Sequence, residues 1–293
     1  MTLPELNPPL KWAGGKRWLV PYLQPIWSSH SRRRLVEPFC GGLAVPLGLR
    51  PERALLSDIN PHLINFFRQL QRGLESNLVS ADNDKELFYQ RRERFNTFIQ
   101  EENYETAEAA LLFYYLNRTG YNGLCRFNSQ GLYNVPKGSY KTINYMTTSD
   151  FAPYQEALAN WEFRVGDFED LDLLPGDFVY ADPPYDVPFT QYSKENFNWE
   201  DQVRLAEWLA QHDGPVILSN QATKRIRELY NDLGFTMTVL EAPRRINSNG
   251  DRTPAQEVLA YRNVDVFATK NREVELSFTQ MQMTPAGLEP ATN

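Results

Sequence analysis

Cysteines and long apolar runs are scarce in this sequence of 293 residues. Its 2 cysteines, Cys40 and Cys125, fit neither a disulfide framework nor a cysteine-based metal site. No apolar stretch approaches the roughly 20 residues that a membrane-spanning helix needs. The start, "MTLPELNPPLKWAGG", lacks the basic, apolar and small-residue regions of a signal peptide. We therefore expect a cytoplasmic protein that binds neither membrane nor metal.

Two phosphate-binding motifs are also missing. Gly41-Gly42 is followed by "LAVP", so the dinucleotide fingerprint G-x-G-x-x-G is absent. The "AGGKR" segment (13–17) fails as a phosphate loop, because Leu10 and Arg17 stand where Gly and Ser or Thr are required. These absences argue against hydride transfer and against nucleotide triphosphate hydrolysis.

An overall positive charge is lacking too. The formal net charge is −7 and the pI is about 5.2, which taken alone argues against a nucleic-acid partner. Residues 7–36 and 117–149, however, contain basic side chains and no acidic one. Each run alone is typical of solvated surface. Since both runs are also rich in aromatic residues and glycine, the alternative interpretation is that they form a surface that binds a polyanion.

Short apolar runs alternate with helix-period segments along most of the chain. The strand-like runs are 35–39, 54–58, 162–167, 177–182, 215–220, 235–240 and 257–261, and the helical segments between them are 61–71, 199–212 and 223–234. Strand alternating with helix predicts an α/β fold with a doubly wound, mostly parallel sheet.

The alternation stops between residues 73 and 149. Two helical patterns there, 85–100 and 106–117, lead into the glycine-rich, acid-free stretch. We therefore predict one domain built from residues 1–72 and 150–271, with a mainly helical domain, residues 73–149, inserted into it. Residues 272–293 are polar and without pattern, which predicts a disordered tail.

Polar or flexible residues follow four of the predicted strands. The segment Phe39 to Gly42 forms a turn that lets the backbone approach a ligand closely. Asp58, Asp167 and Asp182 each follow another strand, and Asp58 stands where a Rossmann-like sheet places a carboxylate for ribose hydroxyls. In such sheets ligands bind at the carboxyl ends of the strands.

The segment "YADPPYD" (180–186) is the strongest single signal. Two prolines fix the backbone and remove its N–H donors, leaving a rigid segment that presents acceptors. Asp182 adds a carboxylate acceptor, and Tyr185 offers a face on which a flat ring could stack. Such a pair of acceptors suits an exocyclic amine, which has two N–H donors on one atom.

Seven collinear motifs between residues 9 and 262 carry a family resemblance. They are "LKWAGGK" (10–16), "LVEPFCGG" (35–42), "SDINPHLI" (57–64), "LNRTGYNGLCRFNSQGLYNVPKGSY" (116–140), "YADPPY" (180–185), "VILSN" (216–220) and "RRINSNG" (244–250). In these motifs the chain resembles the N6-adenine DNA methyltransferases, and among them the GATC-specific adenine methylases of the Dam type.

The resemblance implies a Rossmann-like catalytic domain that uses S-adenosylmethionine and flips the target adenine out of the duplex. The catalytic loop would be Asp182, Pro183, Pro184 and Tyr185, in which the Asp182 carboxylate and the Pro183 carbonyl accept from the amine. The implied cofactor-binding residues are Trp12, Lys16, Phe39, Gly41, Gly42, Asp58, Asp167 and Asp182.

The resemblance also makes the inserted domain a target-recognition domain that carries a hairpin. Tyr121 would wedge into the base stack, Asn122 would lie near the flipped base, and Leu124, Arg126 and Pro136 would read base edges. Lys11 matches the residue that reads the outer guanine, and Asn128 and Lys141 complete the implied DNA-binding set. The implied partner is double-stranded DNA, the expected site is GATC, and the enzyme is expected to be a monomer.

One departure and three alternatives accompany this interpretation. The family often shows F-x-G-x-G after the first strand, but Leu43 stands at the position of the second spaced Gly. An N4-cytosine methyltransferase is one alternative, although such enzymes usually begin the motif with Ser where this chain has Asp182. The others are a catalytically inactive DNA-binding module, and a modification methylase of another adenine site paired with a restriction nuclease.

Overall fold

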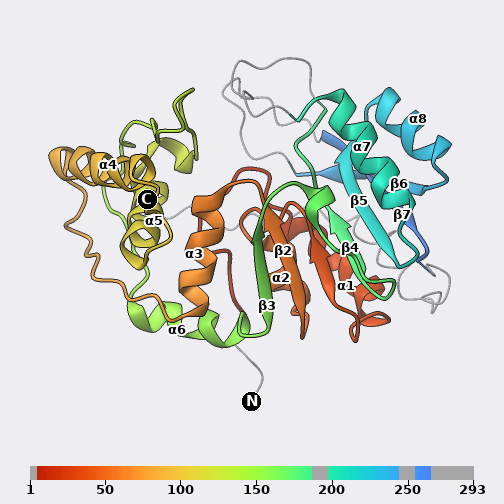
Figure 1. Cartoon of the computed structure of the whole chain (residues 1–293), viewed down its shortest axis with the longest axis horizontal. Coiled ribbons are helices and arrows are strands. Elements are labelled where there is room, and N and C mark those ends of the chain that lie inside the picture. The colour runs from red at the N-terminus through yellow and green to blue at the C-terminus, as the bar shows by residue number, and fades with distance from the viewer. Residues whose placement is uncertain (1–4, 187–196, 244–254, 265–293) are drawn as a thin grey trace.

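The computed structural model describes residues 5–186, 197–243 and 255–264, which form a twisted sheet covered by helices (Figure 1). Seven strands run in the order β3-β2-β1-β4-β5-β7-β6 within these residues. They are β1 (Leu35–Glu37), β2 (Ala54–Asp58), β3 (Trp161–Val165), β4 (Phe178–Ala181), β5 (Val216–Gln221), β6 (Thr236–Ala242) and β7 (Ala255–Arg262). The first five in this order pair in parallel, whereas β7 is antiparallel to both β5 and β6. The predicted mostly parallel α/β sheet is confirmed.

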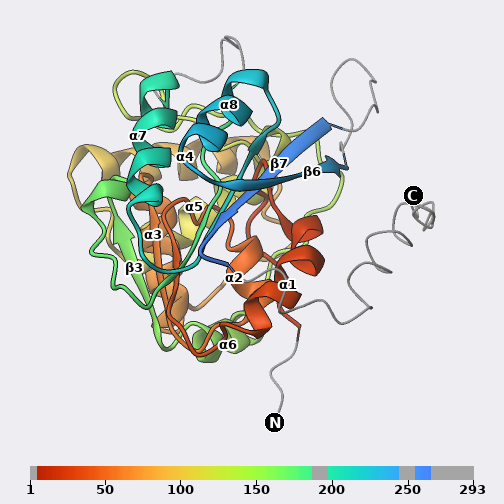
Figure 2. The ribbon, with the colours of Figure 1, turned by 90° about the vertical axis from the view of Figure 1, so that its right-hand side faces the viewer.

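The described part of the chain contains eight α-helices. They are α1 (Val20–Ser28), α2 (Ala44–Leu49), α3 (Pro61–Gln71), α4 (Lys85–Gln100), α5 (Ala107–Thr119), α6 (Thr148–Ala157), α7 (Trp199–Ala210) and α8 (Lys224–Asp232). Short 3-10 helices span Arg17–Leu19 (η1), Tyr121–Gly123 (η2) and Phe168–Asp170 (η3). Figure 2 shows β6 and β7 at the sheet edge that faces the viewer.

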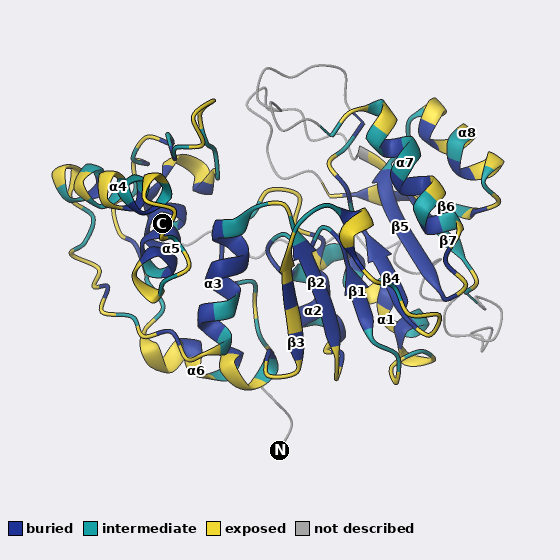
Figure 3. Ribbon diagram, in the orientation of Figure 1, coloured by how far each residue is buried: buried dark blue, intermediate teal, exposed yellow. Residues whose placement is uncertain are grey.

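Alternate residues of the strands point to two separate hydrophobic clusters. Leu35, Leu56 and Tyr180 pack with side chains of α1, α2 and α3 on one face. Val36 and Val179 pack with side chains of α7 and α8 on the other. This alternation follows from the period of two in a strand. Helices therefore cover both faces, as a doubly wound sheet requires, and the central strands are buried (Figure 3).

Residues Arg32 to Arg34 lie away from the carboxyl ends of the strands. They directly precede β1, and the Arg34 guanidinium donates to both oxygens of Asp177, at 3.0 and 2.6 Å, just before β4. Arg33 donates to the Gly176 carbonyl at 2.9 Å. Arg33 and Arg34 of the first acid-free stretch thus join the segments before neighbouring strands, at the edge opposite to the predicted ligand site.

Helices α4 and α5 lie beyond α3 in Figure 1, and the chain then folds back on itself between residues 120 and 137. Two antiparallel bridges, Gly120 with Lys137 and Phe127 with Tyr133, make this hairpin. Buried side chains of α4 and α5 belong to the same cluster as one face of the sheet. The limits 73 and 149 of an inserted domain stay a prediction.

Some sequence predictions lie outside the described residues. These are the "RRINSNG" motif (244–250) and the tail 272–293. Among the helices that the structure describes, none is long and apolar enough to cross a bilayer.

Candidate active site

A cavity of about 1680 Å³ opens at the carboxyl ends of β1, β2 and β4. It also reaches the hairpin, from which Cys125, Arg126 and Asn128 contribute to its wall. All residues that the sequence assigned to catalysis or cofactor binding line it: Trp12, Lys16, Phe39, Gly41, Gly42, Asp58, Asp167, Asp182, Pro183, Pro184 and Tyr185. The structure therefore brings these residues together, while their individual roles stay predictions.

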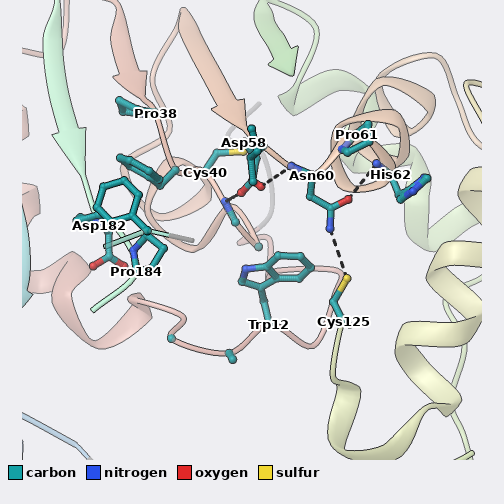
Figure 4. A pocket seen from close by; sticks show the side chains of 18 of the residues that line it. Trp12, Pro38, Cys40, Asp58, Asn60, Pro61, His62, Cys125, Asp182 and Pro184 are labelled. Carbon is teal, nitrogen blue, oxygen red and sulfur yellow. Dashed lines mark hydrogen bonds between the residues drawn. The ribbon is translucent and has the colours of Figure 1, made fainter. Parts of the chain in front are cut away.

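The Gly41-Gly42 turn lies directly against the Trp12 side chain. A Cβ atom on Gly41 would approach Trp12 Nε1 to 2.9 Å, and one on Gly42 would approach Trp12 Cβ to 2.9 Å. Gly41 also has a φ of 45°, a conformation that favours glycine. Figure 4 shows Trp12 between Asp182 and Pro184 on one side and Asn60 and Cys125 on the other. A side chain at Gly41 or Gly42 would therefore collide with Trp12, so both positions require glycine.

Leu43 adopts a backbone conformation that glycine adopts readily. Its φ of 62° and ψ of 27° place it in the left-handed region, directly before α2. That conformation costs a residue with a Cβ atom about 1–2 kcal/mol. The Leu43 side chain is fully buried in the core, which offsets this cost. Leu43 is therefore accommodated between the glycine turn and α2.

Asp58 is fixed at the end of β2 by two backbone donors. Its Oδ2 accepts from the Gly41 N–H at 3.1 Å, and its Oδ1 accepts from the Asn60 N–H at 2.9 Å (Figure 4). Asn60 in turn caps α3, because its side chain accepts from His62 and Leu63. The carboxylate is thereby held beside the glycine turn.

Asp167 follows β3 and already has a cationic partner. Its two carboxylate oxygens accept from Arg204 of α7 at 3.1 and 3.0 Å, and Oδ1 also accepts from the Glu169 N–H. The Arg204 guanidinium further contacts Asp201. Sequence reasoning missed Arg204, because a basic residue on an amphipathic helix gives no signal of its partner.

Asp182 leaves one carboxylate oxygen open toward the cavity. Its Oδ1 accepts from the Ser219 hydroxyl at 2.8 Å and forms an ion pair with Lys16 at 3.2 Å. Within the described residues, Oδ2 has no hydrogen-bond partner. Burial raises the pKa of Asp182 to about 6, although Lys16 and Ser219 oppose that shift.

Of the two proline carbonyls that follow Asp182, one has a hydrogen-bond partner and the other has none among the described residues. The Pro184 carbonyl accepts from Gln202 Nε2 at 2.8 Å, and Gln202 Oε1 accepts from Asn220 Nδ2 at 2.9 Å. Both of these polar side chains are buried. The Pro183 carbonyl has no partner within the part of the chain that the structure describes. The loop thus presents two open acceptors, Asp182 Oδ2 and the Pro183 carbonyl, on a braced backbone.

Two buried carboxylates near Asp182 were missed by sequence reasoning. Glu257 of β7 pairs with Lys16 at 2.9 Å and accepts from the Tyr185 hydroxyl. Glu37 ends β1, lines the cavity and is buried, and its Oε2 has no partner within the described residues. Burial, followed by the charges of Asp182 and Asp58, raises the pKa of Glu37 well above its usual range. The only signal in the sequence was an acid within a short apolar strand.

Most of the predicted DNA-binding residues lie outside the cavity wall. Arg126 and Asn128 line the cavity, whereas Lys11, Tyr121, Asn122, Leu124, Pro136 and Lys141 do not. Tyr121 is 51% exposed and Leu124 38% exposed on the hairpin. Both side chains present apolar surface to solvent on the hairpin, and their contact with DNA stays a prediction.

Lys11 links the N-terminal segment to the hairpin region. Its Nζ donates to the Arg118 carbonyl at 3.0 Å and lies 3.9 Å from the centroid of the Tyr140 ring. Arg126 is braced within the hairpin, because its Nε donates to Asn134 Oδ1 at 2.8 Å. Among the described residues, no group of three or more His, Cys, Asp and Glu side chains could hold a metal ion.

Comparison with known proteins decides the family. The sequence pattern of the family described as D12 class N6 adenine-specific DNA methyltransferase matches residues 12–246, most of the chain. The chain belongs to this family. The matched range includes residues of the cavity wall described above, and an adenine-specific DNA methyltransferase acts on DNA.

Curated relatives support the same assignment. The retron Ec67 DNA adenine methylase of Escherichia coli is 35% identical, with 86% of this chain and 90% of the relative covered. The DNA adenine methylase of Escherichia coli K12 is 36% identical over 86% and 93% of the two chains. The Type II methyltransferase M1.LlaDCHI of Lactococcus lactis is 35% identical over 86% and 92%. N4-cytosine methylation is thereby disfavoured.

Proposed function

We propose that this methyltransferase transfers a methyl group from S-adenosylmethionine to N6 of an adenine flipped out of double-stranded DNA, within GATC. The observation that carries the proposal is the pair of acceptors without protein partners, Asp182 Oδ2 and the Pro183 carbonyl, on residues that line one cavity. An exocyclic amine has two N–H donors on one nitrogen and suits such a pair.

The cavity wall fits S-adenosylmethionine. Its volume of about 1680 Å³ exceeds the roughly 300–1,000 Å³ of an ordinary small-molecule pocket, which leaves room for a cofactor and a base. Asp58 would accept from ribose hydroxyls beside the Gly41-Gly42 turn. The unpartnered Oε2 of Glu37 suits a polar group of the cofactor's methionyl end. When bound, the cofactor supplies an electrophilic methyl group.

The chain's own residues would orient the amine for attack. Adenine's amino nitrogen is a poor nucleophile, because its lone pair is delocalised into the ring. Accepting its two N–H groups at Asp182 Oδ2 and the Pro183 carbonyl favours a tetrahedral nitrogen whose lone pair points at the methyl group. Tyr185 would stack on the flipped base. The contribution is one of orientation and of electrostatic complementarity.

The rate of methyl transfer should fall in acid. Because burial raises the pKa of Asp182 to about 6, its carboxylate is ionised above that pH and protonated below it. Only the ionised form offers Oδ2 as a full acceptor, so kcat should decrease as the pH drops through this range. Single-turnover rates measured on both sides of this pKa check the expectation, and a rate independent of pH would contradict it.

Replacing Asp58 with alanine should weaken cofactor binding. The change removes a charged acceptor for the ribose, and such hydrogen bonds contribute about 1.5–3 kcal/mol, or roughly 10- to 150-fold in Kd. Calorimetric titration with S-adenosylmethionine measures the effect. Asp232→Ala, at an exposed position that ends α8, is the matched control and should bind as the wild type does. Equal affinities for the two variants would remove Asp58 from the site.

The hairpin would supply the DNA sequence specificity. Tyr121 and Leu124 are exposed there, and the braced Arg126 lies where the cavity wall meets the hairpin. We propose that Tyr121 enters the base stack, that Asn122 lies near the flipped base, and that Leu124, Arg126, Pro136 and Lys11 read base edges. Asn128 and Lys141 would complete this surface.

Methyl transfer to short duplexes tests the proposal directly. A duplex with one GATC site should accept methyl groups, and the same duplex with the site permuted to GTAC should not. Transfer to both duplexes, or to neither, would refute the GATC specificity, and a lack of transfer to unmethylated genomic DNA as well would refute the activity. The enzyme is expected to act as a monomer. A cognate restriction nuclease is the second partner to test, because one relative is a Type II methyltransferase.

A further inference from the structure

We propose that Glu257 is a positioning residue of the methyl-transfer site, which holds Lys16 and Tyr185 so that Asp182 keeps Oδ2 open for the substrate amine. The inference rests on the proposed function. Glu257 lies in neither the catalytic loop nor the cavity wall, so it would act through other side chains.

The antiparallel strand β7 places this carboxylate beneath the catalytic loop. Glu257 lies opposite Gln221 of β5 and Leu240 of β6, so a neighbouring strand fixes it on each side. Its side chain is 7% exposed. One oxygen pairs with Lys16 at 2.9 Å, and the other accepts from the Tyr185 hydroxyl. Both oxygens of Glu257 are therefore committed to residues at the site.

Lys16 is shared between two carboxylates. Its Nζ lies 2.9 Å from Glu257 Oε2 and 3.2 Å from Asp182 Oδ1. Its side chain is 5% exposed, so the ammonium has little access to water. The pull of Glu257 keeps the ammonium on the Oδ1 side of Asp182, where Ser219 also donates. Without the attraction of Glu257, Lys16 would pair with Asp182 alone, and its ammonium would be free to contact Oδ2.

Glu257 and Lys16 also hold the side chain of Tyr185. Its hydroxyl donates to Glu257 and accepts from Lys16, and the Lys16 ammonium lies 4.4 Å from the centroid of its ring. A ring anchored at its hydroxyl keeps one orientation, as a stacking surface for the flipped base must. One carboxylate thereby fixes both the acceptor and the stacking face.

Several other groups lie near Asp182 and also affect its pKa. Glu37 comes from β1, Tyr180 from β4, Ser219 from β5, and Lys16 from the segment before η1. Lys16 is the cation in contact with Asp182 among the described residues. The negative charge of Glu257 raises the pKa of Asp182, while Lys16 lowers it. Removing the charge of Glu257 should therefore lower the pKa of Asp182.

The test is the pH dependence of kcat in Glu257→Gln. A glutamine keeps the shape but removes the charge, so Lys16 should shift to Asp182. We expect kcat well above the pKa of Asp182 to fall about 10- to 100-fold, as a misplaced group would cause. The acid limb of the profile should move to lower pH. KM for DNA should stay near the wild-type value, because Glu257 does not touch the substrate.

Two further variants keep the test decisive. Glu241→Gln changes an exposed acid on the neighbouring strand β6 and should leave both kcat and the acid limb unchanged. Glu257→Asp keeps the charge but shortens the reach, so its acid limb should match the wild type while kcat falls. If Glu257→Gln does not fold, as judged by thermal melting, a wild-type kcat in Glu257→Asp would overturn the inference.

The outcomes separate this inference from the proposed function. An unshifted acid limb in a folded Glu257→Gln, whether kcat is normal or uniformly reduced, would overturn the positioning role alone. An inactive wild type, or an active Asp182→Ala, would instead overturn the proposed function. An inactive Asp182→Ala together with a shifted limb in Glu257→Gln supports both.

Discussion

Replacing Asp182 with alanine is expected to lower kcat by at least about 10²- to 10³-fold, the loss typical of removing one preorganised electrostatic contact. The variant lacks Oδ2, the open acceptor for the amine, and retains only the Pro183 carbonyl. Lys16 would still be paired with Glu257 at 2.9 Å, so no buried charge is left alone and the fold should survive. Single-turnover methyl transfer and thermal melting measure the two effects.

Binding provides the control for this variant. Asp182→Ala should bind a GATC duplex within a few-fold of the wild type, because the hairpin and not Asp182 would contact the unflipped bases. Asp232→Ala, at an exposed site on α8, should keep full activity. If Asp182→Ala turned over at a near-normal rate, the amine could not depend on this carboxylate and the mechanism would be wrong.

Replacing Arg126 with alanine is expected to relax discrimination at one base pair by about 1–3 kcal/mol. An arginine that reaches O6 and N7 of a guanine is the commonest base-specific contact in DNA recognition. Here Asn134 holds the Arg126 Nε at 2.8 Å, so the guanidinium is oriented before DNA arrives. The measurement is kcat/KM on GATC and on duplexes changed at each single position.

The pattern of losses distinguishes a base contact from a phosphate contact. A base reader should lose its preference at one position only, whereas a phosphate contact would weaken all duplexes alike and reduce the salt dependence. Arg32→Ala serves as the control, because Arg32 lies just before β1 at the opposite edge of the sheet. A uniform loss for Arg126→Ala would show that Arg126 contacts a DNA phosphate. Other hairpin residues would then have to provide the sequence specificity.

The strands could be predicted from the sequence because each is a short apolar run between turn signals. All seven expected runs coincide with strands, and the pattern 85–100 matches α4 at both ends. Helices α1, α2 and α6 were missed. Pro25 lies inside α1, Pro153 inside α6, and Gly48 within the six residues of α2, and such residues normally argue against a helix. Packing against the core overrides that local preference.

The site was predictable to the extent that the sheet determines it. Parallel strands end at one edge, so Asp58, Asp167 and Asp182 were expected to meet there, and all three line the cavity. Glu257 could not be found in this way, because it enters from the antiparallel strand β7. The partners of Lys16 depend on the same tertiary placement. Sequence reasoning assigned Lys16 to the cofactor, whereas its ammonium in this structure faces two carboxylates.

The sequence predicted a cationic surface only in part. Two acid-free stretches stood out in a chain of net charge −7. Arg34 of the first forms an ion pair with the buried Asp177, a contact that spacing along the chain cannot reveal. The second stretch contains the exposed Tyr121 and Leu124 and remains the expected DNA contact.

The central claim is adenine N6 methylation in DNA, and mapping genomic methylation tests it most directly. The chain would be expressed in a methylase-deficient host, beside its Asp182→Ala variant, and the DNA read by single-molecule sequencing that distinguishes N6-methyladenine from N4-methylcytosine. The account predicts N6-methyladenine at GATC with the wild type and far less of it with the variant. N4-methylcytosine, or no modification from a folded wild-type chain, would contradict it.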